Sequence, residues 1–237
     1  MSVLEDLLVV QDHDSAVDRL RHRLETLPDK ARLAEIEQQL TALETSLAGV
    51  SDRRDEVVRR QQRHEDELAS IEAKIGEVDR RLYSGTVSAP RELQAMEADL
   101  GSLKRHRSDV EDHVLETMQD REPLDTELAG LEQQWTTLEQ EAEQLRQAIA
   151  VQSAAIEAEL ATELEARTAA AADIPEDLLS QYERLRATQG GVGAARLVSG
   201  RCSGCHLTLP ATELDRIRRG GADTVVLCDQ CGRILVR

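Results

Sequence analysis

The sequence predicts a mainly α-helical protein, in which a long antiparallel coiled-coil helical hairpin is followed by a small C-terminal β module. Three observations lead to this prediction. Apolar residues recur at alternating steps of three and four over two long stretches. The 237 residues include no Phe, one Trp and two Tyr, while 32% of them are charged. All four cysteines lie at or after position 202. The first two observations are typical of coiled coils, and the third marks a separate module.

The apolar repeat defines two helical arms. The first arm runs from Ile36 to Leu82 and the second from Leu93 to Ile156, and neither repeat slips. A repeat of alternating four and three is a heptad seam with a period of 3.5 residues. A few polar residues occupy seam positions: Arg54, Gln61 and His64 in the first arm, and Arg107, Thr117, Arg121 and Gln152 in the second. We expect such residues to set the register of the two arms rather than to form a site.

A short turn near residues 84–89 connects the arms. Gly85 suits the C-terminus of a helix, Ser88 offers an N-cap, and Pro90 fits the first turn of a new helix. A connection of about six residues makes the two arms antiparallel neighbours. At about 1.5 Å per residue, an arm of roughly 80 residues spans about 120 Å, which leaves no room for a buried active site.

The hairpin is predicted to take up residues 1–172, with breaks at two places. Pro28 interrupts the early apolar register, so we expect Val3–Leu27 to form a separately angled helix. Pro123 is expected to face Gly49 across the hairpin, which predicts a shared kink or a short unwinding there.

Residues 173–195 are predicted to form a short helix and a Gly-rich linker. Asp173 is the expected N-cap and Pro175 fits the first turn, so the helix should begin there. Gly190–Gly193 contains three glycines and predicts a flexible joint before the last module, residues 196–237.

The cysteines form two Cys-x-x-Cys pairs, Cys202 with Cys205 and Cys228 with Cys231. In a reducing compartment this pattern favours a metal over disulfides, and four thiolates suit tetrahedral Zn²⁺. Because four sulfur ligands leave no coordination position open, one structural zinc is expected. The apolar segments beside the pairs predict a zinc ribbon with two hairpins, with strands at 196–199, 207–209, 224–227 and 233–236. Iron in the same geometry is disfavoured because aromatic residues are scarce, and a redox dithiol lacks its βαβ setting.

Charge is unevenly distributed along the chain. The net charge is −17, but residues 196–237 carry seven Arg and four acidic residues, so the module is at +3 and the remainder at −20. RNA or DNA would therefore bind at the module, through the candidate residues Arg201, Arg216, Arg218, Arg219 and Arg233. The alternative interpretation is a solvated basic face that pairs with nearby acids. Without aromatic residues for base stacking, we expect weak, salt-dependent binding at most.

Composition and apolar patterning exclude several classes of protein. A conventional α/β enzyme lacks its aromatic core here, and no apolar stretch or basic leader indicates a membrane or secreted protein. We expect a cytoplasmic, non-enzymatic interaction protein that is a monomer or weak homodimer. Its expected partners are proteins, bound through the coiled coil and the ribbon, and no small-molecule substrate is expected. The alternative is an electron-transfer protein that uses the four-cysteine metal site.

These motifs resemble a bacterial family of four-cysteine zinc ribbon proteins with a long coiled-coil hairpin. The resemblance rests on Leu82–Gly85 and Pro90–Gln94 at the hairpin turn, Ile174-Pro175 and Tyr182–Arg186 before the ribbon, and the two cysteine knuckles with Ile217–Gly220 between them. One departure is Asp229, which stands where many such ribbons have Pro. The resemblance implies an adaptor or chaperone-like role. Members of the family are linked to flagellar and type III secretion systems, to an alternative sigma factor and to messenger RNA.

Overall fold

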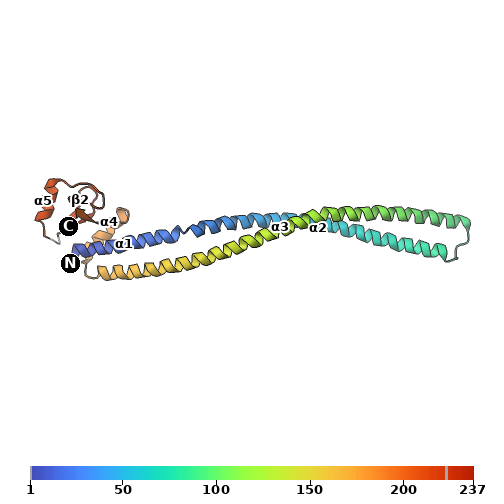
Figure 1. Cartoon of the computed structure of the whole chain (residues 1–237), viewed down its shortest axis with the longest axis horizontal. Helices are drawn as coiled ribbons and strands as arrows, with labels where there is room; N and C mark the ends of the chain where they lie inside the picture. The colour runs from blue at the N-terminus through green and yellow to red at the C-terminus, as the bar shows by residue number, and fades with distance from the viewer. Residues whose placement is uncertain (1, 222–223) are drawn as a thin grey trace. The chain divides into compact units, whose positions relative to one another are not determined.

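A computed structural model describes residues 2–221 and 224–237 of the chain (Figure 1). Four helices come first: α1 (Val3–Glu25), α2 (Pro28–Tyr83), α3 (Pro90–Ala171) and α4 (Glu176–Thr188). The C-terminal part contains β1 (Ala194–Val198), β2 (Arg201–Cys202), α5 (Ala211–Arg219), β3 (Val226–Leu227) and β4 (Ile234–Val236). The predicted fold class, a helical hairpin followed by a small β module, is confirmed. The chain divides into two compact units, Leu33–Gln144 on one hand and Met1–Arg32 with Leu145–Arg237 on the other.

The first unit is the antiparallel pair formed by most of α2 and the part of α3 up to Gln144. Ion pairs cross between the two helices, as from Arg81 to Glu92 near the turn and from Arg53 to Glu127 farther away, both at 3.2 Å. Every predicted seam position from Ile36 to Ala142 is buried or half-buried, whereas most residues between them are exposed. The heptad register therefore describes the packing of this unit, as expected for an apolar stripe that repeats every seven residues.

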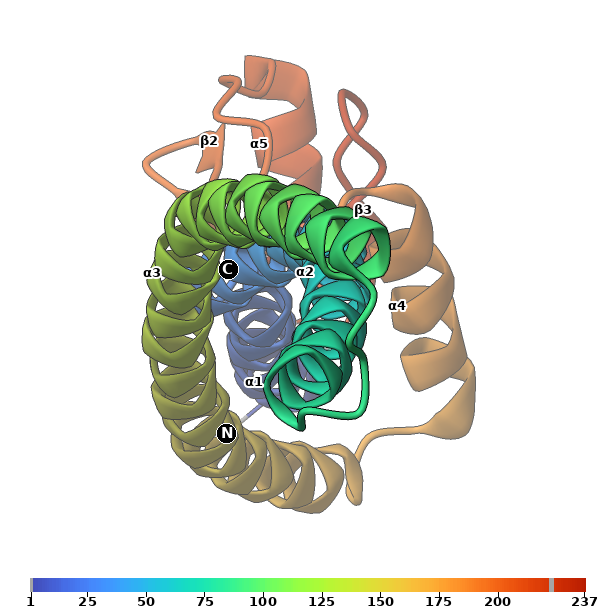
Figure 2. The ribbon, with the colours of Figure 1, turned by 90° about the vertical axis from the view of Figure 1, so that its right-hand side faces the viewer.

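The connection between α2 and α3 faces the viewer in Figure 2. Helix α2 ends at Tyr83 and α3 begins at Pro90, so the turn lies where the sequence predicts it. Gly85 adopts a φ of +72°, which suits glycine. The expected N-cap is different, because the carbonyl of Ala89, not Ser88, precedes the helix and accepts hydrogen bonds from Glu92 N (3.0 Å) and Leu93 N (3.1 Å).

The short unwinding expected at Gly49 and Pro123 is absent from the described helices. Helix α2 continues through Gly49 and α3 continues through Pro123. Asp120 pairs with Arg60 and Asp125 pairs with Arg54, so Pro123 lies opposite the stretch between those arginines rather than opposite Gly49. Pro123 is on the exposed side of α3, where water can solvate the carbonyl that loses its hydrogen bond. The other expected break is present, since α1 ends at Glu25 and α2 starts at Pro28.

The second unit has an apolar core between the first helix and the C-terminal strands. Helices α1 and α4, strands β1 and β4 and the residue Ile174 just before α4 contribute its buried members: Leu4, Leu7, Val10, Ile174, Leu178, Tyr182, Ala194, Ile234 and Val236. We call this group the base core. Because the chain ends that form it are far apart in sequence, the first helix and the last strand depend on each other for burial.

The C-terminal strands form one sheet in the order β2-β1-β4-β3. Strand β1 is parallel to β4, with Ala194 opposite Ile234, while β1–β2 and β3–β4 are antiparallel. Since side chains alternate along a strand, Ile234 and Val236 enter the base core, whereas Leu235 enters a second core with Ala195 and Ile217 of α5. The sheet is thus a middle layer with an apolar core on each face.

Two expected features of the β module are corrected by this topology. Residues 207–209 form no strand, and a single bridge from Thr208 to Arg201 stands in their place. The module is also more than two separate hairpins, because β1 pairs with β4 across both cysteine pairs. This parallel pairing helps to bury β4 and the first two residues of β1, which isolated hairpins with strands of two or three residues could not do.

The Gly-rich segment 190–193 is held in place instead of forming a flexible joint. The side-chain carbonyl of Gln11 accepts hydrogen bonds from Gly193 N (2.6 Å) and Ala194 N (3.3 Å), and its amide donates to Gly191 O (3.0 Å). A Cβ at Gly193 would lie 2.7 Å from the carbonyl oxygen of Tyr182. Glycine is required here because the backbone approaches Tyr182 closely, and not because the segment must be mobile.

The start of α4 differs slightly from the prediction. Its N-cap is Pro175 and no side chain caps it, so Asp173 does not take that role. No helix in the described part of the chain combines the length and the apolarity that a membrane span needs.

Candidate metal centre

The two Cys-x-x-Cys segments fold into the same backbone turn. In each, the first cysteine N–H donates to the carbonyl five residues later, Cys202 to Leu207 (3.1 Å) and Cys228 to Arg233 (2.8 Å). In each, the carbonyl of that cysteine accepts from the residue four positions later, at 2.8 Å in the first turn and 2.7 Å in the second. This repeated turn directs both sulfur atoms of a pair to one side.

The residue after each second cysteine has a left-handed backbone. Gly232 has a φ of +73° and His206 a φ of +61°. Glycine adopts this conformation freely, whereas for His206 it costs about 1 kcal/mol. Arg201 donates a hydrogen bond to the carbonyl of His206 (3.0 Å), which helps to hold the strained residue.

The four sulfur atoms converge. The Sγ atoms of Cys202 and Cys231 are 3.9 Å apart, as are those of Cys205 and Cys228, and all four lie within 4.8 Å of one another. A tetrahedral zinc with Zn–S bonds of about 2.3 Å requires sulfurs about 3.8 Å apart. The sulfur positions therefore suit a four-coordinate metal. They form the only cluster of three or more potential ligands among residues 2–221 and 224–237.

The cysteines pack against the second apolar core, the one that contains Leu235 and Ile217. Cys202 and Cys228 are buried in it with aliphatic neighbours from β1, β4 and α5, whereas Cys205 and Cys231 are half-buried. Burial raises the pKa of the Cys202 thiol and raises that of Cys228 to about 12. Burial acts in the same direction on Cys231, but hydrogen bonds from the backbone and side chain of Arg233 and from the thiols of Cys228 and Cys205 together outweigh it and lower the pKa to about 7. A bound cation would displace the remaining thiol protons.

The arginines that the sequence predicts for nucleic-acid contact take different positions. Arg233 turns inward, where its guanidinium donates to the carbonyls of Val192 (2.9 Å) and Gln189 (2.7 Å). This structural role removes Arg233 from the candidate surface. Arg201 is exposed, but one of its N–H groups is engaged with the carbonyl of His206, as described above.

The other three arginines share the last turn of α5. Arg216 lies 3.8 Å from Asp229 of the second knuckle, and both side chains are more than half exposed. Arg218 and Arg219 are exposed, and neither has an ion pair with another residue in the part of the chain described. These three form a basic end on α5, which we call the α5 arginine cluster.

Sequence reasoning missed a buried polar network beside the base core. Asp14 accepts hydrogen bonds from the hydroxyl of Tyr182 (2.7 Å) and from Arg167 Nε (3.1 Å), and Arg186 Nε lies 3.6 Å away. Burial and the bond to Asp14 raise the pKa of Tyr182 above its ordinary value. Tyr182 and Arg186 stand in the motif that carries the family resemblance, but nothing in the sequence pointed to Asp14, which lies 168 positions from Tyr182.

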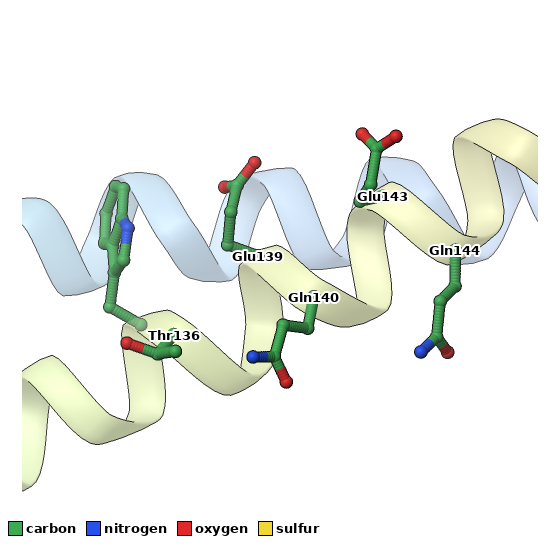
Figure 3. Close-up of a pocket in the computed structure, with 6 residues that line it drawn as sticks. Thr136, Glu139, Gln140, Glu143 and Gln144 are labelled. Atoms are coloured by element: carbon green, nitrogen blue, oxygen red, sulfur yellow. The ribbon is translucent and has the colours of Figure 1, made fainter.

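One surface hollow is lined by residues of α3 alone: Trp135, Thr136, Glu139, Gln140, Glu143 and Gln144. In Figure 3, Glu139 and Glu143 point away from Gln140 and Gln144, so the polar side chains do not converge on one point. A binding site usually brings a few polar groups together in a concave pocket.

Comparison with known proteins agrees with this geometry. The protein Rv2229c from Mycobacterium tuberculosis is 28% identical over 231 residues, covering 98% of this chain and 94% of the relative. A solved structure from Mycobacterium smegmatis has a TM-score of 0.86 at 25% identity, covering 99% of this chain and 97% of that one. The structure of CT398 from Chlamydia trachomatis has a TM-score of 0.69 at 20% identity, with 99% and 97% covered, and shares the fold.

Two family descriptions match successive parts of the chain. Residues 201–235 match the C4-type zinc ribbon domain, which contains all four converging cysteines. Residues 10–190 match the CT398-like coiled coil hairpin domain, which spans helices α2, α3 and α4 and most of α1. The chain therefore belongs to the family of proteins with a CT398-like coiled-coil hairpin, here followed by a C4-type zinc ribbon.

Proposed function

We propose that the protein is a non-enzymatic adaptor that holds one structural Zn²⁺ in its ribbon and binds protein partners through its exposed surfaces. The observation that carries this proposal is the convergence of four cysteine sulfurs within 4.8 Å. Four sulfur ligands fill a tetrahedral metal, so neither water nor substrate can reach the ion. A closed site of this kind stabilises a fold and performs no chemistry of its own.

Zinc is favoured over iron by the surroundings of the sulfurs. The buried neighbours of the cysteines are the aliphatic residues Ala195, Leu209, Ile217 and Leu235. An electron-transfer iron centre of the rubredoxin type would instead be packed against aromatic rings. Because the metal must be held by thiolates, the cysteines must stay reduced, which makes the cytoplasm the proposed compartment.

Metal analysis of protein purified without added metal tests the assignment. We expect one zinc per chain, a colourless protein and no thiol-disulfide exchange activity. Red protein that contains iron would overturn the proposal and support the electron-transfer alternative. Affinity purification from the native host, with wild type and Cys228→Ser side by side, then tests the adaptor role. We expect a stoichiometric partner that the variant recovers less well, because the ribbon is part of the binding surface.

Weak nucleic-acid binding at the ribbon is a second candidate function, favoured by the α5 arginine cluster. Phosphate attraction acts over a Debye length of about 8 Å at physiological salt, so the acidic helices affect it little once they are more distant than that. The test compares RNA binding at about 50 mM salt for wild type and a variant with Arg216, Arg218 and Arg219 replaced by Glu. Replacement of the exposed Arg19, Arg21 and Arg23 of α1 by Glu is the matched control.

Loss of binding in the first variant alone would support a nucleic-acid site on α5. No binding by the wild type, or equal loss in both variants, would rule the site out and leave the ribbon as a protein-docking module.

A further inference from the structure

The last strand of the chain joins the cysteine centre to the helical hairpin. Strand β4 begins three residues after Cys231 and has a side chain in each core. Leu235 packs with the cysteines, while Ile234 and Val236 pack in the base core with α1. All three side chains are at most 2% exposed. Displacement of this strand would therefore disturb both cores together.

Arg233 provides a second connection. Its backbone carbonyl accepts the N–H of Cys228 (2.8 Å), and its guanidinium binds the carbonyls of Val192 (2.9 Å) and Gln189 (2.7 Å). The next residue, Ile234, donates its N–H to the carbonyl of Gly193 (2.9 Å). The second knuckle is thus bonded directly to the segment that follows α4.

Gln11 of α1 binds the same segment from the other side. Its side-chain amide makes three hydrogen bonds to the backbone of residues 191–194, and Gln11 itself is only 5% exposed. The path from metal to helix therefore passes through three adjacent contacts: the second knuckle with Arg233, Arg233 with the Gly-rich segment, and that segment with Gln11.

Without a metal, the ribbon lacks the interaction that holds it together. A module of about 40 residues with strands of two to five residues buries too little surface to fold alone, so metal binding supplies much of its folding free energy. Helices α1 and α4 have contacts of their own, the bond from Tyr182 to Asp14 (2.7 Å) and the pair of Arg186 with Asp18 (2.7 Å). These contacts do not involve β4 and would survive its release.

We propose that the cysteine centre is a metal-dependent latch on the hairpin base: zinc occupancy keeps β4 over α1, and zinc loss uncovers the apolar face of Leu4, Leu7 and Val10. The proposal rests on zinc as the resident metal and goes beyond it by making the order of α1 depend on metal occupancy. Because coupling between two equilibria is reciprocal, contacts of α1 with the Gly-rich segment must also strengthen zinc binding.

Hydrogen exchange of the full-length protein, with zinc and after its removal by a chelator, tests the first direction. We expect amides of residues 4–10 and 190–194 to exchange at least about tenfold faster without metal, while those of residues 33–83 stay unchanged. Equal protection of α1 in both states overturns the latch and leaves the metal assignment intact. Protein that never contains zinc would contradict the proposed function itself.

Zinc affinity tests the reverse direction. In Gln11→Ala the four cysteines are untouched, but the bonds of α1 to the Gly-rich segment are lost. Competition with a chromophoric chelator should show zinc binding weakened about tenfold, because those bonds form only when the ribbon is folded onto α1. Gln39→Ala, at an exposed position of α2, is the control and should bind zinc like the wild type. Unchanged affinity in Gln11→Ala, with wild-type helicity, would also overturn the latch.

Discussion

Replacement of Asp14 by Asn should loosen the hairpin base far more than the same change at Asp18. Both carboxylates belong to α1 and both face Arg186, at 3.6 Å and 2.7 Å respectively. Their environments differ, since the side chain of Asp14 is 6% exposed and that of Asp18 is 43% exposed. The pair of variants therefore compares one chemical change at a buried and at a solvated position.

The magnitude follows from what each change leaves behind. Loss of the Asp14 charge leaves Arg167 and Arg186 facing a neutral amide, with the more exposed Glu183 and Asp18 as remaining carboxylate partners, and these arginines are only 22% and 20% exposed. Breaking a buried pair from one side costs about 3 kcal/mol, while an exposed pair contributes less than about 1 kcal/mol. We expect amide exchange in α4 to accelerate on the order of a hundredfold in Asp14→Asn, and less than about fivefold in Asp18→Asn.

Hydrogen exchange followed by mass spectrometry gives the measurement, with the α4 peptide (residues 176–188) as the reporter. Far-UV circular dichroism of both variants should match the wild type, because the α2–α3 pair is unaffected. Equal acceleration in the two variants would refute the argument from burial. A larger effect in Asp18→Asn would show that the shorter contact of Asp18 with Arg186, and not the more buried contact of Asp14, holds α1 to α4.

Three further outcomes are expected. Cys228→Ser should bind less than one zinc per chain and become cleavable by protease near residues 190–193, while the long helices persist. A variant with full zinc content and wild-type protease resistance would contradict the metal site. In a Tyr83→Phe background, Tyr182 should give no tyrosinate absorbance at pH 10, because its pKa is raised in the folded state. Because the unfolded state ionises first, the wild type loses stability as the pH rises above about 10, and the free energy of unfolding of Tyr182→Phe should fall less over the same range. Arg54→Leu should raise the melting temperature of the α2–α3 pair, because the bond of Arg54 to Asp125 is solvated and an apolar seam residue packs better. A lower melting temperature would show that the Arg54–Asp125 ion pair is needed for stability.

The hairpin could be predicted because its packing depends on local periodicity. A residue at every third or fourth position faces the partner helix, whatever the partner is, so the seam is visible in one arm alone. The one predicted seam position that is exposed is Gln152, whose amide donates to Asp29 (2.8 Å) instead of entering the interface. A polar residue can occupy the edge of a seam in this way. Gln152 is one of the polar residues that interrupt the apolar repeat of the second arm in the sequence.

The cysteine spacing likewise predicted the metal ligands, since a Cys-x-x-Cys turn is a local structure. The attachment of the ribbon was not predictable. It depends on contacts between Gln11 and Gly193, 182 positions apart, and on the pairing of β1 with β4. Glycines gave a misleading signal, because the composition that permits a flexible joint also permits the close backbone contact seen at Gly193. Which of these two roles a glycine has depends on the residues that pack against it in the folded protein.

Periodicity alone does not determine the register of α2 against α3, and the polar seam residues do. A seam that repeats every seven residues can shift by one heptad, about 10.5 Å, and still match apolar residues. In the observed register Arg121 reaches Gln61 (3.2 Å) and Asp125 (3.2 Å), and Asp125 also binds Arg54 (3.0 Å). A shift of one heptad would separate the cross-helix partners and leave half-buried polar groups without them. This cluster therefore adds little stability to the correct pairing but makes the incorrect pairings costly.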